Sequence, residues 1–228
     1  MRATRERCVK VASSHLEAQI AFKVTSPGFS AVYLFTIISN FHLSTFSTSS
    51  SGLTFAMDDD TTNKHLRYLS EALELAKKSP PKPTNFCVGA LLLDTVNDKV
   101  LSTGYTLELP GNTHAEQCCL SKLAQEHNLS EEEVGKIIPE HAVLYTTMEP
   151  CFVRLSGNLP CVQRVLQTSS NGYHGIKSVV CGVKEPETFV GENKGRKALA
   201  DGGVDVIYVT GLEDEILKVA TAGHRESS

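Results

Sequence analysis

One histidine and two cysteines form the most chemically distinctive set in this sequence. His114 opens the segment His-Ala-Glu, and each cysteine follows a proline, at Pro150-Cys151 and Pro160-Cys161. One imidazole and two thiolates make a ligand set that suits zinc. A structural zinc site normally has a fourth protein ligand, whereas three ligands leave one position open for water. The sequence therefore predicts a catalytic zinc site formed by His114, Cys151 and Cys161.

We expect these ligands to lie at the N-termini of helices. His114 begins a predicted helix over 114–127, and Pro150 suits the first position of another helix, with Cys151 directly after it. The N–H groups and the positive dipole end at such positions lower the pKa of a thiol, so both cysteines can bind as thiolates. Cys118 lies one turn past His114, and we interpret it as a core residue rather than a fourth ligand.

Glu116 lies two residues after the predicted histidine ligand and is not expected to bind the metal. Its position fits a proton shuttle, which takes a proton from the metal-bound water and delivers it to a ring nitrogen and then to the leaving amine. Such a reaction is the hydrolytic deamination of an amino-substituted heterocycle, and H-x-E with P-C-x-x-C is typical of zinc nucleobase deaminases. Each short motif alone is an ordinary helix start or core residue, but their joint occurrence in the expected order favours the metal site.

The spacing of the two cysteines departs from that signature. Nine residues lie between Cys151 and Cys161, where the signature has two. A loop of this length can still bring both sulfurs to one metal, and it adds a wall to the pocket. Arg154, Ser156 and Asn158 are the polar groups that this wall could offer to a substrate.

The elements that must position these residues follow from hydrophobic periodicity and turn residues. A helical pattern runs from Thr61 to the prolines that begin at Pro80, and Ser130 with Glu133 has the spacing of a capping box. A strand, helix, strand order near the C-terminus implies parallel pairing. The sequence predicts an α/β fold with three layers, α/β/α, on a mixed sheet of about five strands. Strands are expected over 86–93, 100–105, 142–147, 176–182 and 204–209, and further helices over 161–167, 194–200 and 212–222.

Charge and cysteine usage exclude several classes of protein. The chain has 228 residues and a net charge of −4, of which residues 1–56 carry +3, so residues 57–228 carry −7. This negative charge argues against binding to nucleic-acid phosphate. The sequence contains no run of 18 apolar residues, so no membrane-spanning helix is expected. Seven cysteines are an odd number and form no dense disulfide framework, which favours a reducing, cytoplasmic location.

Residues 1–56 have no sustained hydrophobic period and end in a stretch rich in serine and threonine. We leave them unassigned and interpret them as a dispensable, disordered extension or as the result of a wrongly chosen start codon. Their Arg and Ser content would also fit a mitochondrial targeting segment, which we do not favour. Met57 begins a different pattern, so we expect the deaminase domain to occupy residues 57–228.

Several long segments around the predicted site resemble one family of enzymes. They are residues 103–105, 108–118, 145–151, 154–158 and 160–161, together with 182–186 and 188–190. These segments closely resemble the fungal riboflavin-pathway deaminase, and the resemblance covers residues 62–225. It implies the cytidine-deaminase fold, a homodimer and a zinc cofactor. It also implies conversion of 2,5-diamino-6-ribitylamino-4(3H)-pyrimidinone 5′-phosphate to 5-amino-6-ribitylaminouracil 5′-phosphate with loss of ammonia.

The resemblance assigns roles to individual residues. His114, Cys151 and Cys161 match the zinc ligands, Glu116 matches the proton shuttle, and Asn85 matches a position that contacts substrate. A phosphate needs cationic or N–H donors, so Arg154 is the first candidate for it, although a solvated surface arginine is an equally good interpretation. Glu108 and Asn112 could bind the ribityl hydroxyls or merely shape the turn, and Asn85 is equally well interpreted as a turn residue between a helix and a strand. Ser156 and Asn158 are the remaining substrate candidates on the loop between the cysteines.

Other functions stay open from sequence alone. A deoxycytidylate deaminase or a tRNA adenosine deaminase would keep the same metal site and Glu116, but the tRNA enzyme should have a basic face. A catalytically inactive zinc module that serves as a binding subunit is an alternative of a different class. The intact Glu116 argues against the inactive module. We expect a small phosphorylated pyrimidine as the partner, with no nucleic acid and no membrane.

Overall fold

The computed structural model describes residues 7–8, 18–26, 29–37, 59–186 and 194–224, and the chain divides into two units, Met1–Thr54 and Phe55–Ser228. In the first unit, β1 (Arg7–Cys8), β2 (Ala18–Ser26) and β3 (Phe29–Ile37) form an antiparallel three-stranded sheet. The sequence analysis assigned no element to this region. The interpretation of residues 1–56 as a dispensable extension stays a prediction.

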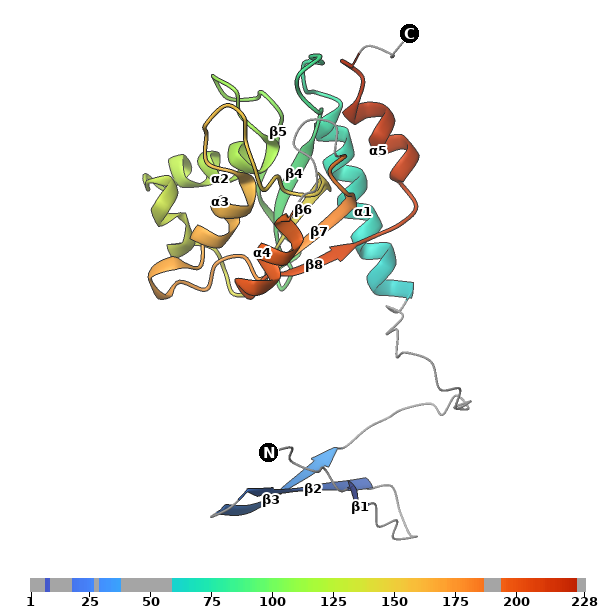
Figure 1. Ribbon diagram of the computed structural model, residues 1–228, viewed down its shortest axis with the longest axis vertical. Coiled ribbons are helices and arrows are strands. Elements are labelled where there is room, and N and C mark those ends of the chain that lie inside the picture. The colour runs from blue at the N-terminus through green and yellow to red at the C-terminus, as the bar shows by residue number, and fades with distance from the viewer. Residues whose placement is uncertain (1–6, 9–17, 27–28, 38–58, 187–193, 225–228) are drawn as a thin grey trace. The chain divides into compact units, whose positions relative to one another are not determined.

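The second unit is built on a mixed sheet of five strands in the order β5-β4-β6-β7-β8 (Figure 1). Strand β4 pairs antiparallel with both β5 and β6, whereas β6, β7 and β8 run parallel. The predicted α/β fold class is thereby confirmed. The strands are β4 (Gly89–Asp94), β5 (Lys99–Tyr105), β6 (Ala142–Met148), β7 (Ser178–Val183) and β8 (Asp205–Tyr208).

Helices cover both faces of this sheet because its buried residues alternate between the two faces. Leu91 and Leu93 pack with residues of α1, whereas Ala90 and Leu92 pack with residues of α2. Figure 1 shows α1 and α5 on one side of the sheet and α2, α3 and α4 on the other. The helices are α1 (Asp59–Ala76), α2 (Ala115–Glu126), α3 (Cys161–Gln167), α4 (Gly195–Asp201) and α5 (Glu213–Ala220), with 3-10 turns η1 (Glu131–Lys136) and η2 (Ser170–Gly172).

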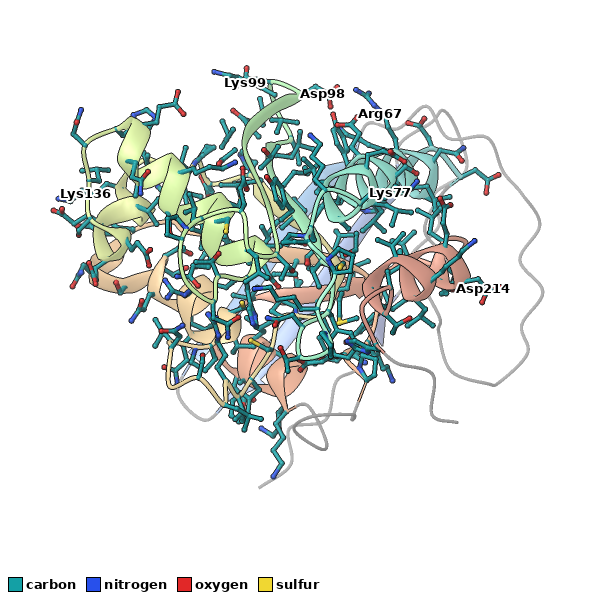
Figure 2. All side chains as sticks on the ribbon, turned by 90° about the horizontal axis from the view of Figure 1, so that it is seen from above. Arg67, Lys77, Asp98, Lys99, Lys136 and Asp214 are labelled. Carbon is teal, nitrogen blue, oxygen red and sulfur yellow. The ribbon has the colours of Figure 1, made fainter. Side chains whose placement is uncertain are left out.

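Helix α1 is fastened to the turn between β4 and β5. The hydroxyl of Tyr68 donates to Asp98 at 2.8 Å, and Lys64 and Arg67 lie 3.1 and 3.6 Å from the same carboxylate. Figure 2 shows Arg67 and Asp98 close together at this end of the unit.

Among the helices that the structure describes, none is both long and apolar enough to cross a membrane.

Helix α2 lies unusually close to the edge strand β5. A Cβ atom added at Gly104 would come within 2.2 Å of the carbonyl oxygen of Ala115 and 2.6 Å of the amide nitrogen of Cys119. Glycine at this position therefore allows the first turn of α2 to approach the sheet. This approach matters for function because the first turn of α2 carries two of the predicted site residues.

The predicted strand over 86–93 begins three residues late, at Gly89. The amide of Val88 donates to the side-chain hydroxyl of Thr106 at 3.0 Å instead of entering the strand ladder. Phe86 and Val88 instead line the cavity described below. The first part of the apolar run thus lines a pocket, and the rest forms a strand. Hydrophobic periodicity alone does not distinguish these two parts.

Candidate active site

The predicted metal ligands come together from three separate segments. His114 is the N-cap residue of α2, Cys161 is the first residue of α3, and Cys151 lies in the segment that follows β6. The Nδ1 atom of His114 lies 3.5 Å from each of the two sulfurs, and the three ligand atoms all lie within 4.8 Å of one another. A tetrahedral zinc ion with ordinary bond lengths separates a nitrogen and a sulfur ligand by about 3.6 Å. The donor set and its spacing therefore fit zinc.

The helix predicted to begin at Pro150 is absent, so that prediction is wrong. The chain continues from Cys151 as an irregular loop, and the helix begins ten residues later at Cys161, with Pro160 as its N-cap residue. Gly157 in this loop has a φ of +77°, and a proline ends the loop, so these residues do not suit a continuous helix. Only Cys161 of the two cysteines lies at a helix N-terminus.

The two sulfurs differ in acidity because they interact with each other. The thiol of Cys161 donates a hydrogen bond to the sulfur of Cys151, and together with the nearby His114 this holds the pKa of Cys151 well below its usual value. The same contact and complete burial raise the pKa of Cys161. The pair therefore shares its acidity, with Cys151 as the more acidic sulfur.

Glu116 lies in the first turn of α2 with its carboxyl group directed at the ligand cluster. Its side chain is almost completely buried, with 3% of the residue exposed, and its Oε2 atom lies 3.3 Å from the sulfur of Cys161. Burial is the main cause that raises the pKa of this carboxyl, and the neighbouring charge of Cys151 adds to it. A raised pKa makes a carboxyl a stronger base and a more readily protonated group, which suits a general acid–base.

A cavity of about 430 Å³ opens next to this cluster. His114, Glu116 and Cys151 form part of its wall, so a molecule inside it lies beside the predicted metal and shuttle. Four of the predicted substrate residues also line it. These four are Asn85, Asn112, Arg154 and Ser156.

Asn85 and Asn112 are joined across the cavity wall. The side-chain amide of Asn85 donates to the side-chain oxygen of Asn112 at 2.8 Å, and Thr84 donates to the oxygen of Asn85 at 2.9 Å. The ring of His224 lies 3.1 Å from the backbone oxygen of Asn85, so the C-terminal segment also holds this loop. These contacts fix the two amides in positions from which they can meet a polar ligand.

The structure does not bring Glu108 and Asn158 to the cavity. Glu108 forms an ion pair with Lys122 at 2.5 Å and accepts a hydrogen bond from the amide of Tyr105 at 3.2 Å, so it stabilises the turn that follows β5. The side chain of Asn158 donates to the backbone oxygen of Asn112 at 3.4 Å. Both residues thus contribute to loop structure.

Arg154 is a buried residue that links two loops. One terminal nitrogen donates to the side chain of Gln117 at 2.9 Å, and the other donates to the backbone oxygen of Asn112. Within the described residues, its Nε atom is buried without a hydrogen-bond partner. Arg154 is therefore not a solvated surface residue. Its Nε–H group is available to donate a hydrogen bond to a ligand.

Glu185 is a cavity residue whose role the sequence reasoning missed. It follows β7 at the carboxyl end of the parallel strands and lines the cavity. Its Oε2 atom is buried with no hydrogen-bond partner among the described residues. Burial, with added repulsion from Cys151, Glu116 and Glu149, raises the pKa of its carboxyl to about 8. The available signal was an acidic residue two positions after a buried strand, within the segment 182–186 that resembles the deaminase family.

Glu185→Gln is expected to change how stability depends on pH. The carboxyl of Glu185 has a pKa raised from 4.5 to about 8, so the native state favours its neutral form and loses stability as the pH rises between these two values. Glutamine does not ionise and removes this loss. The thermal midpoint of the variant minus that of the wild type should increase from pH 5 to pH 8 and then stay constant. A difference that does not depend on pH would contradict the raised pKa.

The fold and the cluster of His114, Cys151 and Cys161 fit a zinc-binding deaminase. Residues 62–182 match the sequence model of the family "Cytidine and deoxycytidylate deaminase zinc-binding region", and the chain belongs to this family. This match confirms the predicted deaminase superfamily and enzyme class, and the relatives described next confirm the predicted resemblance to the fungal riboflavin-pathway deaminase.

The chain is also similar to individual named deaminases. The chain is 36% identical over 160 residues to a diaminohydroxyphosphoribosylamino-pyrimidine deaminase of Schizosaccharomyces pombe. The match covers 70% of this chain and 36% of that protein, so the chain spans about a third of the length of this curated relative. Among solved structures, it is similar to the Aspergillus oryzae Rib2 deaminase, with 52% identity and a TM-score of 0.67 over 71% of this chain and 93% of that one.

The same Aspergillus oryzae protein has also been solved in complex with DARIPP, at 50% identity and a TM-score of 0.65, over 71% of this chain and 92% of that one. A bacterial deaminase/reductase of Thermotoga maritima is more distant, with 25% identity and a TM-score of 0.53. The match covers 70% of this chain and 40% of the bacterial one.

Proposed function

We propose that this chain deaminates 2,5-diamino-6-ribitylamino-4(3H)-pyrimidinone 5′-phosphate to 5-amino-6-ribitylaminouracil 5′-phosphate and ammonia, as a step of riboflavin biosynthesis. The observation that carries the proposal is the cluster of His114, Cys151 and Cys161 with the buried Glu116 on the wall of one cavity. The match to 93% of a Rib2 deaminase supports the choice of substrate.

His114, Cys151 and Cys161 would hold the zinc ion, and Glu116 performs the proton transfers. When bound, zinc acts as a Lewis acid and lowers the pKa of a water molecule, so that the water loses a proton more readily at neutral pH. The carboxylate of Glu116 accepts the proton that the attacking water loses, and it passes this proton to a ring nitrogen. It then delivers the second proton of the water to the amino group as the carbon–nitrogen bond breaks. The ring gains a carbonyl oxygen, and ammonia leaves, so atoms and charges balance.

The remaining cavity residues would position the substrate. Asn85, Asn112 and Ser156 offer amide and hydroxyl groups to the polar edge of the ring and to the ribityl chain. Arg154 is the cation in the described lining of the cavity, and its free Nε donor supports the proposal that it attracts the phosphate. Glu185 adds a buried carboxyl that can accept hydrogen bonds from the amino groups of the ring.

The substrate assignment is tested by offering two candidates to the same preparation of the full chain. Ammonia release is measured with the ribitylamino-pyrimidinone phosphate and with deoxycytidylate at equal concentrations. The proposal predicts turnover of the first compound and none of the second. Turnover of deoxycytidylate alone would keep the mechanism and overturn the substrate. Bound zinc with neither activity would favour the alternative of an inactive zinc module.

Residues 57–228 are expected to carry the whole activity. The metal ligands, Glu116 and the cavity all lie in the second unit, so removal of residues 1–56 should leave kcat/KM within about twofold of the full chain. The two proteins are compared in the same ammonia assay. A loss larger than tenfold on removal of these residues would refute the interpretation as a dispensable extension.

The family resemblance also supports a homodimer. A chain of 24.8 kDa is expected to sediment as a particle of twice that mass at micromolar concentration. A single species with the mass of one chain would contradict this prediction.

We place the enzyme in the cytoplasm. The six cysteines described in the second unit are all free, which suits a reducing compartment. In an oxidising compartment, any unfolding that exposed the buried thiols would allow them to be oxidised.

A further inference from the structure

The loop between the two cysteine ligands packs only partly against the core. It has nine residues where the family signature has two; Phe152 packs against the core, but two other apolar side chains are exposed, with 79% of Leu155 and 46% of Val153 accessible to solvent. A longer loop loses more conformational entropy when its ends are fixed at one metal. The second ligand, Cys161, therefore depends on contacts made by neighbouring residues.

Two arginines converge on one carbonyl oxygen of this loop. The backbone oxygen of Leu159, two residues before Cys161, lies 3.3 Å from Nε of Arg164 and 3.5 Å from a terminal nitrogen of Arg154. Arg154 approaches from the start of the loop, and Arg164 approaches from α3. Both side chains are largely removed from solvent, so these charge-assisted contacts are stronger than contacts at the surface.

Arg164 is itself fixed by a chain of polar contacts to α2. Its guanidinium pairs with Glu131 at the start of η1, and the other oxygen of Glu131 accepts a hydrogen bond from Ser121 on α2. Ser121 lies on the same helix that begins after His114 and carries Glu116. The chain of contacts thus joins the helix of the histidine ligand to the helix of the Cys161 ligand.

We propose that Arg164 and Glu131 are positioning residues that hold the loop end and the sulfur of Cys161 at the metal centre. Neither residue lines the cavity, so they act through Leu159 and α3 and do not touch the substrate. This inference rests on the proposed zinc ligands. It adds that this network, which does not touch the substrate, determines how firmly the metal is held.

The test measures the rate at which zinc leaves the intact protein. Full-length wild type, Arg164→Gln and Glu131→Gln are mixed with a chromogenic zinc chelator well below their thermal midpoints. Loss of such supporting contacts typically lowers metal affinity by 10–100-fold, so zinc should leave both variants at least about tenfold faster. Arg164→Lys keeps the charge toward Glu131 but lacks the planar fork that also reaches Leu159, and it should restore part of the slow release.

Lys136→Gln is the matched control because Lys136 forms an exposed ion pair with Glu133 in the same η1 turn. It should change the rate of release by less than about twofold, as expected for a surface pair. If zinc leaves both variants at the wild-type rate, or leaves Lys136→Gln equally fast, the inference is overturned. If Arg164→Gln does not fold, Glu131→Gln decides the question by the same measurement. A wild type that retains no zinc would instead refute the proposed function.

Discussion

Glu116→Gln is expected to lower kcat for the pyrimidinone substrate by about a thousandfold, within the range of general acid–base contributions. The amide has nearly the same shape as the carboxyl but can neither accept the proton of the attacking water nor return it to the leaving amine. Zinc should stay bound at the wild-type level, because Glu116 is not among the three clustered ligands. The variant should also fold, since it removes a buried carboxyl whose pKa burial has raised.

The measurement for Glu116→Gln pairs ammonia release with zinc content on one sample. Glu108→Gln is a suitable control, because Glu108 belongs to the loop before α2 but pairs with Lys122 and does not line the cavity. The control should keep activity within about threefold of wild type, because the amide can still accept the hydrogen bond from the backbone of Tyr105 and the residue does not face the substrate. Near-normal turnover by Glu116→Gln would refute the proton-shuttle role, and loss of zinc would show that Glu116 supports the metal.

Cys161→Ser is expected to remove both zinc and activity. A hydroxyl is a much poorer zinc ligand than a thiolate, and two protein ligands do not hold the ion firmly. Zinc content should fall from one ion per chain to less than about a tenth, and the thermal midpoint should fall to that of the metal-depleted wild type. Metal analysis after dialysis and thermal unfolding with and without added zinc measure both effects.

Cys118→Ala is the control for the cysteine experiment. Cys118 lies on α2 one turn past His114 and is completely buried, but it is not part of the ligand cluster. This variant should lose stability because it leaves a small gap in the core, yet it should keep its zinc. Zinc loss from Cys118→Ala, or full zinc content in Cys161→Ser, would contradict the assigned ligand set.

Local patterns predicted the helices and strands well. The spacing of Leu66, Leu69 and Leu73 predicted α1, and the capping box of Ser130 and Glu133 is present at the start of η1. The strand, helix, strand order predicted the parallel pair of β7 and β8. These features depend on hydrogen bonds and periodicity between near neighbours, which the sequence displays directly.

The wrong prediction of a helix at Pro150 and the missed cavity residues have a different physical cause, which is contact between segments that are far apart in the sequence. A proline suits the first turn of a helix, but nothing local to Pro150 shows that the chain continues as a loop up to the helix that was correctly predicted over 161–167. The ion pair of Glu108 with Lys122 and the burial of Glu185 depend on which segments the fold brings together. Such long-range contacts leave no period in the sequence, so the clustering of His114, Cys151 and Cys161 was predictable and the details of the cavity wall were not.

The central claim is that one zinc ion at the His114, Cys151 and Cys161 cluster is required for deamination of the pyrimidinone. Its most direct test is to deplete the full chain of metal, restore zinc in steps and record ammonia release from the ribitylamino-pyrimidinone phosphate at each step. Activity should rise in proportion to bound zinc and reach its maximum at one ion per chain. Ammonia release from the metal-free chain, or full zinc binding without any release, would contradict it.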